Sequence, residues 1–307
     1  VSTRAREMGG SSMFLNERDR PTADQLIKGI IVQSGNDATV VVAEGLGGSE
    51  ASFAQLMTER AKSLGMKNSS FANASGWPHP LHRMSMEDLA ILSQKIIEDY
   101  PTYYGYFSMP EWNYDGRVPT NGTNRNPLLK LGIGADGLKT GHTSEAGYGL
   151  AGSAQQDGRR IVFVISGLTS ERERAEEAER LVSWAFRQFV QKPVVDAGVE
   201  IAEVPVWMGD SAVVGVNSTE PIEVLVPLVA SKALEMKVEF EGPVAAPIAA
   251  GDQIADLVIT GPEMEPRRVP LVAGTDVGVG GPLVRIRSAA ETLYREFSAR
   301  NDGTAVN

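Results

Sequence analysis

The chain has 307 residues, and its 42% hydrophobic and 22% charged content is typical of an ordinary globular protein. It contains no cysteine, which excludes thiol catalysis, disulfides and cysteine-based zinc sites. A net charge of −10 without a basic face argues against nucleic acid as a partner, and no run of 18 apolar residues predicts a transmembrane helix.

The first part of the chain alternates helical and strand patterns. Apolar spacing predicts a helix, a short break and a second helix over 22–46, then helices over 50–64 and 85–98, the last capped by Ser85. Further along, 148–154 and 160–165 indicate two strands joined by the hairpin signal Asp157-Gly158. A third strand, at the edge of this antiparallel sheet, is expected just before them. A charged amphipathic helix follows over 171–191, with Phe189 on its apolar face.

The second part of the chain differs in both pattern and charge. Residues 194–281 carry 14 acidic and 4 basic side chains, whereas residues 1–193 carry 22 and 21. Short β-rich stretches at 212–216, 222–226, 236–240 and 269–272 predict a small β-sandwich. Residues 282–298 return to helical spacing. We therefore expect three parts: 1–193, 194–281, and a C-terminal helix and tail over 282–307.

Two short motifs carry chemistry. Lys139-Thr140-Gly141 opens the predicted sheet, and Ser34-Gly35-Asn36 interrupts the helix pair upstream. Each motif alone has a structural interpretation, as a strand start or as a helix-breaking turn. Their order and their contexts favour a functional one.

An edge strand offers backbone hydrogen bonds to an extended peptide, and Gly141 lets that peptide approach. Lys139 brings positive charge and orients the Ser34 hydroxyl, which can relay a proton to a leaving amine. Thr140 can donate a hydrogen bond to a terminal carboxylate, while the Asn36 amide contacts the substrate backbone.

With these motifs the chain resembles low-molecular-weight penicillin-binding proteins, the D-alanyl-D-alanine carboxypeptidases of the serine peptidase S11 type. The resemblance covers nearly the whole chain and rests on six stretches: Gly10–Leu15, Gln33–Ala38, Phe53–Gly65, Asp136–Thr143, Ala146–Tyr148 and Val206–Asp210. It implies an α+β fold: a β-lactamase- and penicillin-binding-protein-like transpeptidase domain (an antiparallel sheet with helices), then the β-sandwich and the terminal helix.

The resemblance also implies roles for individual residues. Ser34, Asn36 and Lys139 are expected to be catalytic, and Thr140, Gly141 and His142 to bind substrate. An arginine near the substrate-carboxylate pocket is also expected. Arg174 is the candidate for it, with Arg172 as a close competitor in the same charged run.

The family's nucleophilic Ser-x-x-Lys motif is not among the 307 residues. An incomplete chain is the favoured explanation, and a pseudoenzyme is the alternative. The implied activity is removal of the terminal D-alanine from peptidoglycan stem pentapeptides through an acyl-enzyme, in the bacterial cell envelope. β-Lactam antibiotics would bind covalently at the same site, and no cofactor is needed. A β-lactamase is disfavoured because no Glu-x-x-Leu-Asn segment occurs, and a non-catalytic peptidoglycan- or penicillin-binding module remains a second hypothesis.

Two further features of the sequence bear on a metal site and on a membrane contact. His79 and His82 have a spacing that could suggest a metal pair, but a proline lies between them and no third histidine is near, so no metal site is expected. The terminal helix has an apolar face and several arginines, and two interpretations stay open: contact with a membrane surface, or packing on the β-domain.

Overall fold

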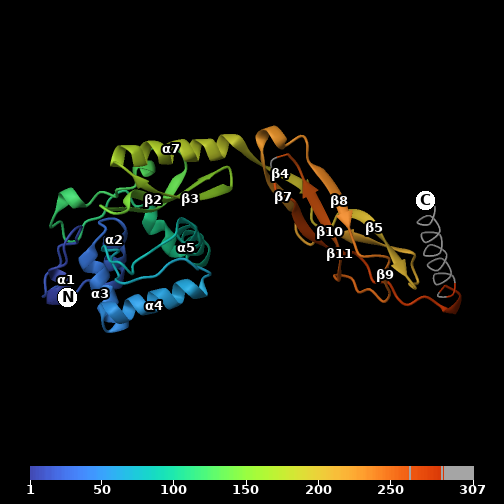
Figure 1. Cartoon of the computed structure of the whole chain (residues 1–307), viewed down its shortest axis with the longest axis horizontal. Coiled ribbons are helices and arrows are strands. Elements are labelled where there is room, and N and C mark those ends of the chain that lie inside the picture. Colours follow the sequence, from blue (N-terminus) through green and yellow to red (C-terminus); the bar gives the residue numbers. More distant parts are fainter. Residues whose placement is uncertain (263, 285, 287–307) are drawn as a thin grey trace, which may run out of the picture. The chain divides into compact units, whose positions relative to one another are not determined.

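The computed structural model describes residues 1–262, 264–284 and 286. The chain divides into a first compact unit, Val1–Phe186, and a second unit from Arg187 onward (Figure 1). Within the described residues, no helix has the length and apolar character needed to cross a membrane. From residue 287 onward, the expected C-terminal helix lies outside the described residues.

Helices make up most of the first half of the first unit. They are α1 (Thr3–Arg6), α2 (Ala23–Ile31), α3 (Asn36–Gly47), α4 (Glu50–Ser63), α5 (Met86–Asp99) and α6 (Pro101–Tyr104), with 3₁₀ turns η1 (Gly105–Ser108), η2 (Pro119–Asn121) and η3 (Pro127–Lys130). Side-chain caps explain several starts: Thr22 forms a capping box with Gln25, and Ser85 accepts a hydrogen bond from the Asp88 amide. The predicted helix–break–helix and the helices near 50–64 and 85–98 are confirmed.

Three antiparallel strands follow in the order β1 (Ala135–Thr143), β2 (Gly147–Gln156) and β3 (Arg159–Leu168). Asp157 and Gly158 both have positive φ, as the tight β2–β3 hairpin requires. Within the described residues β1 pairs only with β2, so Lys139-Thr140-Gly141 lies on an edge strand, as predicted. Figure 1 shows α7 (Glu171–Gln188) on one side of this sheet and α5 on the other. Ala178 and Val182 of α7 pack with buried side chains of the sheet.

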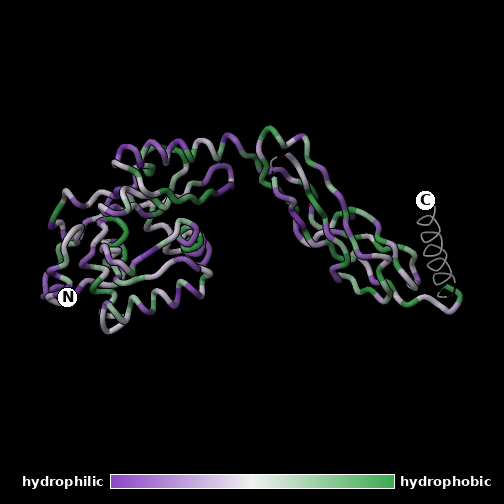
Figure 2. The backbone as a smooth tube through the Cα atoms, in the orientation of Figure 1, coloured by the Kyte–Doolittle hydropathy of each residue, from purple (hydrophilic) through white to green (hydrophobic). Residues whose placement is uncertain are grey.

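One boundary prediction was wrong. The helix expected to run to residue 191 ends at Gln188, and Phe189 starts strand β4 (Phe189–Val195). The backbone of β4 pairs with β7 (Ile222–Pro227), beginning with Phe189 opposite Pro227. This long-range pairing outweighs the local helical periodicity that the sequence shows. Figure 2 shows that α7, which ends just before β4, is largely hydrophilic.

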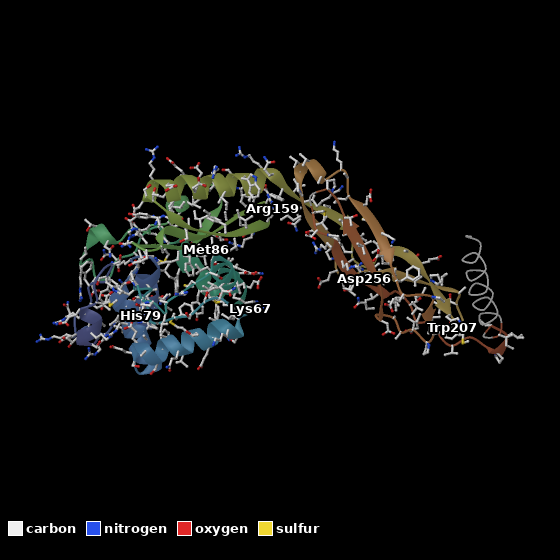
Figure 3. The ribbon with its side chains drawn as sticks, in the orientation of Figure 1. Lys67, His79, Met86, Arg159, Trp207 and Asp256 are labelled. Atoms are coloured by element: carbon white, nitrogen blue, oxygen red, sulfur yellow. The ribbon has the colours of Figure 1, made fainter. Side chains whose placement is uncertain are left out.

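The second unit is a two-sheet β-structure. One sheet has the order β8 (Glu235–Glu239), β10 (Gln253–Thr260), β11 (Arg267–Ala273), β6 (Val213–Asn217), β5 (Glu200–Trp207) and β9 (Val244–Ala245); the other pairs β4 with β7. Alternate side chains of β7 are buried and meet those of the larger sheet in one core. The four predicted strands correspond to β6, β7, β8 and β11, whereas β4, β5, β9 and β10 were missed. Trp207 and Asp256 mark two of the missed strands in Figure 3.

A buried carboxylate ties the first helices together. Asp37, at the start of α3, is fully buried. Its oxygens accept hydrogen bonds from the Ser12 hydroxyl (2.8 Å) and from the amides of Met13 (2.8 Å) and Leu15 (3.0 Å). The segment 11–15 has little secondary structure of its own, so these bonds hold it against the α2–α3 turn.

We expect Asp37→Asn to destabilise the first unit by about 3 kcal/mol, because one acceptor oxygen is replaced by a donor that faces buried N–H and O–H groups. Urea unfolding measures the change. Asp99→Asn, at an exposed position at the end of α5, is the matched control and should leave the free energy of unfolding unchanged. Equal stabilities of the two variants would contradict the anchoring role.

Candidate active site

The Ser34 turn places a hydroxyl at the junction of two helices. The Gly35 amide donates to the Gly29 carbonyl (3.0 Å), which closes the turn after α2. Ser34 adopts φ of 56°, a left-handed conformation that is uncommon for a residue with a side chain. Next to it, the Asn36 side-chain amide donates to the Gly9 carbonyl (2.9 Å). Such strain is often found at functional sites, where the surrounding structure enforces it.

Lys139 joins the two motifs. Its ammonium donates hydrogen bonds to the Ser34 hydroxyl and to the Thr140 carbonyl. Burial of the ammonium, followed by the positive charges of Arg125 and Arg174, lowers the pKa of Lys139 to about 8. The structure therefore brings together Ser34 and Lys139, which lie far apart in the sequence.

Arg125 and Arg174 bring two more positive charges close to Lys139. Arg174 is buried, with 4% of its surface exposed, and its Nε has no hydrogen-bond partner among the described residues. Burial also lowers the pKa of Arg174. The Arg125 guanidinium donates to the Ser11 hydroxyl (2.8 Å) and to the Asn121 side-chain oxygen (2.8 Å).

Within the described residues, none of the three cations, Lys139, Arg125 and Arg174, forms an ion pair with a carboxylate. Uncompensated positive charge in a partly buried site attracts an anion. The arrangement is therefore suited to bind a carboxylate.

The choice between the two candidate arginines follows from burial. The Arg172 side chain is 86% exposed and pairs with Glu176 on the same helix. Arg174 instead turns inward, where its guanidinium lies 5.7 Å from the centre of the Tyr148 ring. His142 stacks on the same tyrosine, with ring centroids 3.9 Å apart. Tyr148 therefore links two of the predicted binding residues.

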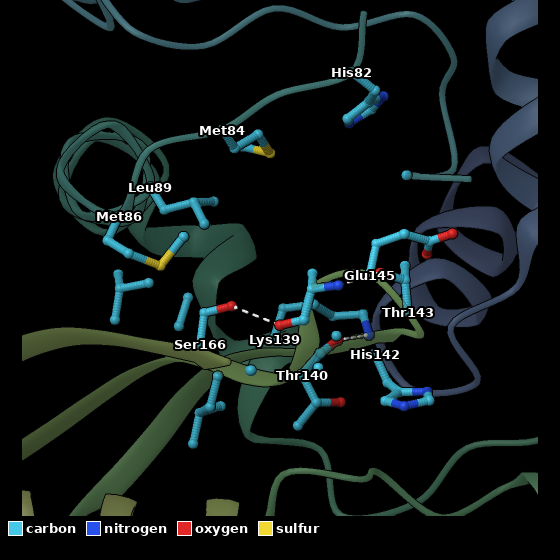
Figure 4. A pocket seen from close by; sticks show the side chains of 18 of the residues that line it. His82, Met84, Met86, Leu89, Lys139, Thr140, His142, Thr143, Glu145 and Ser166 are labelled. Carbon is cyan, nitrogen blue, oxygen red and sulfur yellow. Dashed lines mark hydrogen bonds between the residues drawn. The ribbon is translucent and has the colours of Figure 1, made fainter. Parts of the chain in front are cut away.

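Four of the predicted site residues line one cavity of about 760 Å³, whereas Ser34, Asn36 and Arg174 lie outside its lining. Lys139, Thr140, Gly141 and His142 form part of its wall. Apart from Gly141 and its two chain neighbours, no described residue lies within 4 Å of where a Cβ on Gly141 would be. Figure 4 shows Met84, Met86 and Leu89 facing the strand residues across the cavity. The cavity thus has a polar edge along β1 and an apolar opposite wall.

His79 and His82 both belong to the lining of this cavity. His82 lines the cavity, and its Nδ1 accepts a weak hydrogen bond from the Ala72 amide (3.4 Å). Burial lowers the pKa of His82, with a further contribution from His79. No group of three potential metal ligands occurs in the part of the chain that the structure describes.

Sequence reasoning missed Arg125 and Tyr148 as site residues. Arg125 received no role from the sequence, and Tyr148 only a place at the start of a strand and in one of the six stretches of the resemblance. A signal for Arg125 exists in the sequence, since it lies between two asparagines: the flanking Asn124 and Asn126 are buried, and both hold backbone groups by hydrogen bonds. The proximity of Arg125 to Lys139, and of Tyr148 to Arg174, can be seen only in the tertiary structure.

The lowered pKa of Lys139 predicts a stability change with pH. Between pH of about 8 and the ordinary value of 10.5, the unfolded chain binds more protons than the folded one at this site. The free energy of unfolding contributed by Lys139 should therefore rise with pH across this window. Unfolding of the wild type and of Lys139→Met, compared from pH 7 to 10.5, isolates the effect. The difference should grow in favour of the wild type above pH 8, and a difference independent of pH would contradict the lowered pKa.

Comparison with known proteins places the chain among established relatives. Residues 1–169 match the model of the peptidase S11 family, described as D-alanyl-D-alanine carboxypeptidase. Residues 189–279 match the C-terminal domain of penicillin-binding protein 5. D-Alanyl-D-alanine carboxypeptidase DacD of Escherichia coli is 32% identical over 281 residues, covering 91% of this chain and 72% of that protein. DacF of Bacillus subtilis is 33% identical, covering 84% of this chain and 67% of that protein.

Solved structures agree with these matches. Penicillin-binding protein 5 of Haemophilus influenzae superposes with a TM-score of 0.76 at 32% identity, covering 88% of this chain and 78% of that one. Penicillin-binding protein D2 of Listeria monocytogenes, solved in its ampicillin-bound form, has a TM-score of 0.53 at 29% identity, covering 59% of this chain and 74% of that one. The predicted α+β fold with a following β-domain is thereby confirmed. The chain belongs to the D-alanyl-D-alanine carboxypeptidase family, peptidase S11.

Proposed function

We propose that the protein is a serine-type D-Ala-D-Ala carboxypeptidase that removes the terminal D-alanine from peptidoglycan stem pentapeptides. One observation carries this proposal: the Lys139–Ser34 contact lies beside Arg125 and Arg174, on an open strand edge that lines the cavity. A substrate of this class has a free carboxylate next to its scissile bond, and the cations supply its complement. The names of the relatives support the same activity.

Each site residue has a role in this proposal. The terminal carboxylate binds to Thr140 and Arg174, with Arg125 nearby. The peptide lies along the edge of β1, where Gly141 leaves room for its backbone. Ser34, oriented by Lys139, passes a proton to the leaving amine of D-alanine.

The nucleophile is a serine of a Ser-x-x-Lys segment, which the 307 residues do not contain. We propose that such a segment, from outside these residues, enters the apolar side of the 760 Å³ cavity. The lysine of that segment takes the proton of the serine hydroxyl as the oxygen attacks the carbonyl of the penultimate D-alanine. The proton then passes through Ser34 to the leaving amine as the C–N bond breaks. Water then hydrolyses the ester. A non-catalytic binding module would not need the Lys139–Ser34 contact, and the comparisons do not favour it.

The partners and the location follow from this activity. Stem peptides place the protein in the bacterial cell envelope, in the periplasm or another extracytoplasmic space. β-Lactams would acylate the same serine, and the ampicillin-bound relative supports that assignment. Contact of the C-terminal helix with a membrane surface stays a proposal, because most of that helix lies outside the described residues.

Acylation by penicillin tests the proposed chemistry. Intact mass spectrometry should show one penicilloyl group on a species heavier than the 32.9 kDa of this chain, or on a co-purifying fragment. Lys139→Ala should slow acylation about 100-fold, because the Ser34 proton path loses its orienting group. A species with the mass of this chain alone and no adduct would leave only a binding module.

A charge test addresses the carboxylate site. Arg174→Gln should raise KM for an acyl-D-Ala-D-Ala substrate about 30-fold, since a charged hydrogen bond of about 2 kcal/mol is lost. The matched control is Arg172→Gln, on the exposed side of the same helix, which should stay within about twofold of the wild type. With a C-terminal amide in place of the carboxylate, Arg174→Gln and wild type should become alike. Unchanged discrimination between acid and amide would remove Arg174 from the site.

A further inference from the structure

The loop before α5 carries a tryptophan in a fixed position. The side-chain oxygen of Asn73 accepts hydrogen bonds from the amides of Gly76 (2.8 Å) and Trp77 (3.0 Å), and its nitrogen donates to the Trp77 carbonyl (2.8 Å). One asparagine thus closes the turn from both sides. The backbone of Trp77 is held although the loop has no regular secondary structure.

The indole ring lies beside Gly9 and Gly10, the two glycines that the Asn36 side chain also approaches. A Cβ added to Gly10 would come within 3.2 Å of Trp77 Cζ3 and within 2.8 Å of Asn36 Nδ2. Since Asn36 also donates to the Gly9 carbonyl, the two glycines pass between the ring and the Asn36 amide. Despite this contact, 46% of the surface of Trp77 remains exposed. The free part of the ring is available to a ligand.

Trp77 forms part of the wall of two cavities. One is the 760 Å³ cavity of the site described above. The other has a volume of about 370 Å³ and is lined by Met8, Gly9, Ala51, Ala72 and Asn73, among others. Trp77, Pro78 and His79 belong to both linings, and Figure 3 marks His79 on this segment.

The second cavity has an apolar floor and balanced charges. Its two charged lining residues, Arg4 and Glu50, pair with each other. Glu50 is buried, and it also accepts a hydrogen bond from the Ala74 amide (3.3 Å), which ties the tryptophan loop to α4. No net charge is left to select an ion, so aliphatic and aromatic contact decides what binds here.

We propose that Trp77 and the second cavity form a subsite for the stem peptide on the amino-terminal side of D-Ala-D-Ala. The inference rests on the proposed function, which fixes the carboxylate end of the substrate at the cations. The rest of the peptide must leave that cavity, and Trp77, Pro78 and His79 at its wall also line the second one. The aliphatic side chain of the residue before D-Ala-D-Ala packs on the indole ring. Trp77 is therefore a specificity-determining residue.

Kinetics with two substrates test the subsite. For a stem pentapeptide, Trp77→Ala should raise KM roughly tenfold, whereas for N-acetyl-D-Ala-D-Ala it should change KM less than about twofold. Trp77→Phe should fall between. Leu81→Ala is the matched control, because Leu81 lies on the same loop, is 69% exposed and lines neither cavity. Equal changes for both substrates, or no change for the pentapeptide, would overturn the proposal.

A second variant removes the dependence on loop integrity. Ala51→Trp, at an exposed position on α4, would fill the second cavity while keeping Trp77. It should weaken the pentapeptide selectively and leave the thermal melting of the protein unchanged. A pentapeptide KM equal to that of the wild type would show that the cavity holds no part of the substrate.

Measurements of peptide binding distinguish a failure of the subsite from a failure of the proposed function. If the wild type hydrolyses neither substrate, the function fails, and the subsite is judged by calorimetric titration with the stem tetrapeptide. Trp77→Ala should then weaken tetrapeptide binding roughly tenfold, and Leu81→Ala should not. Equal affinity of Trp77→Ala and wild type would overturn the subsite. Competition by the peptide-free glycan disaccharide would also overturn it, in favour of sugar binding.

Discussion

Three positive charges come together beside the Ser34 turn, and among the described residues none of them forms an ion pair with a carboxylate. Lys139, Arg125 and Arg174 come from three separate parts of the chain. Bringing them together is unfavourable in the absence of an anion, and the lowered pKa of Lys139 reports that repulsion together with burial. The surrounding structure must supply the free energy that keeps them in place. A bound carboxylate would relieve the repulsion, which is why this arrangement favours an anionic ligand.

Hydrogen bonds of Asn126, Asp136 and Asp37 fix the backbone of the segments around these cations. The Asn126 side chain caps η3 and donates to the Gly137 carbonyl (3.0 Å), two residues before Lys139. At the start of β1, Asp136 accepts hydrogen bonds from Tyr104 (2.7 Å) and Arg160 (2.8 Å). Asp37 accepts hydrogen bonds from the segment 11–15 and so holds that segment against the Ser34 turn. Asp37 and Asp136 thus belong to the supporting structure, and neither forms an ion pair with Lys139, Arg125 or Arg174.

The strained turn and the tryptophan loop extend the same principle. Ser34 holds a left-handed conformation because the Gly35–Gly29 bond and the Asn36 contacts fix its neighbours. Trp77 keeps an exposed ring because Asn73 and the buried Glu50 fix its loop. In both cases hydrogen bonds fix a loop that holds one side chain, Ser34 or Trp77, in position to bind a ligand. The reactive end and the proposed peptide subsite are therefore built on rigid neighbours that meet at Asn36.

Local patterns in the sequence were enough for the element types of the first unit, the edge position of Lys139-Thr140-Gly141, and the family resemblance. Capping residues, hydrophobic periodicity and turn residues act over a few positions, so they can be recognised without a structure. They could not reveal the end of α7 or the strands β4, β5, β9 and β10, because pairing with distant strands decides those. Nor could they distinguish Arg174 from Arg172, two positions apart on a helix. Only packing determined which of them is buried beside Tyr148 and which one faces solvent, and only the tertiary structure brought Arg125 to Lys139.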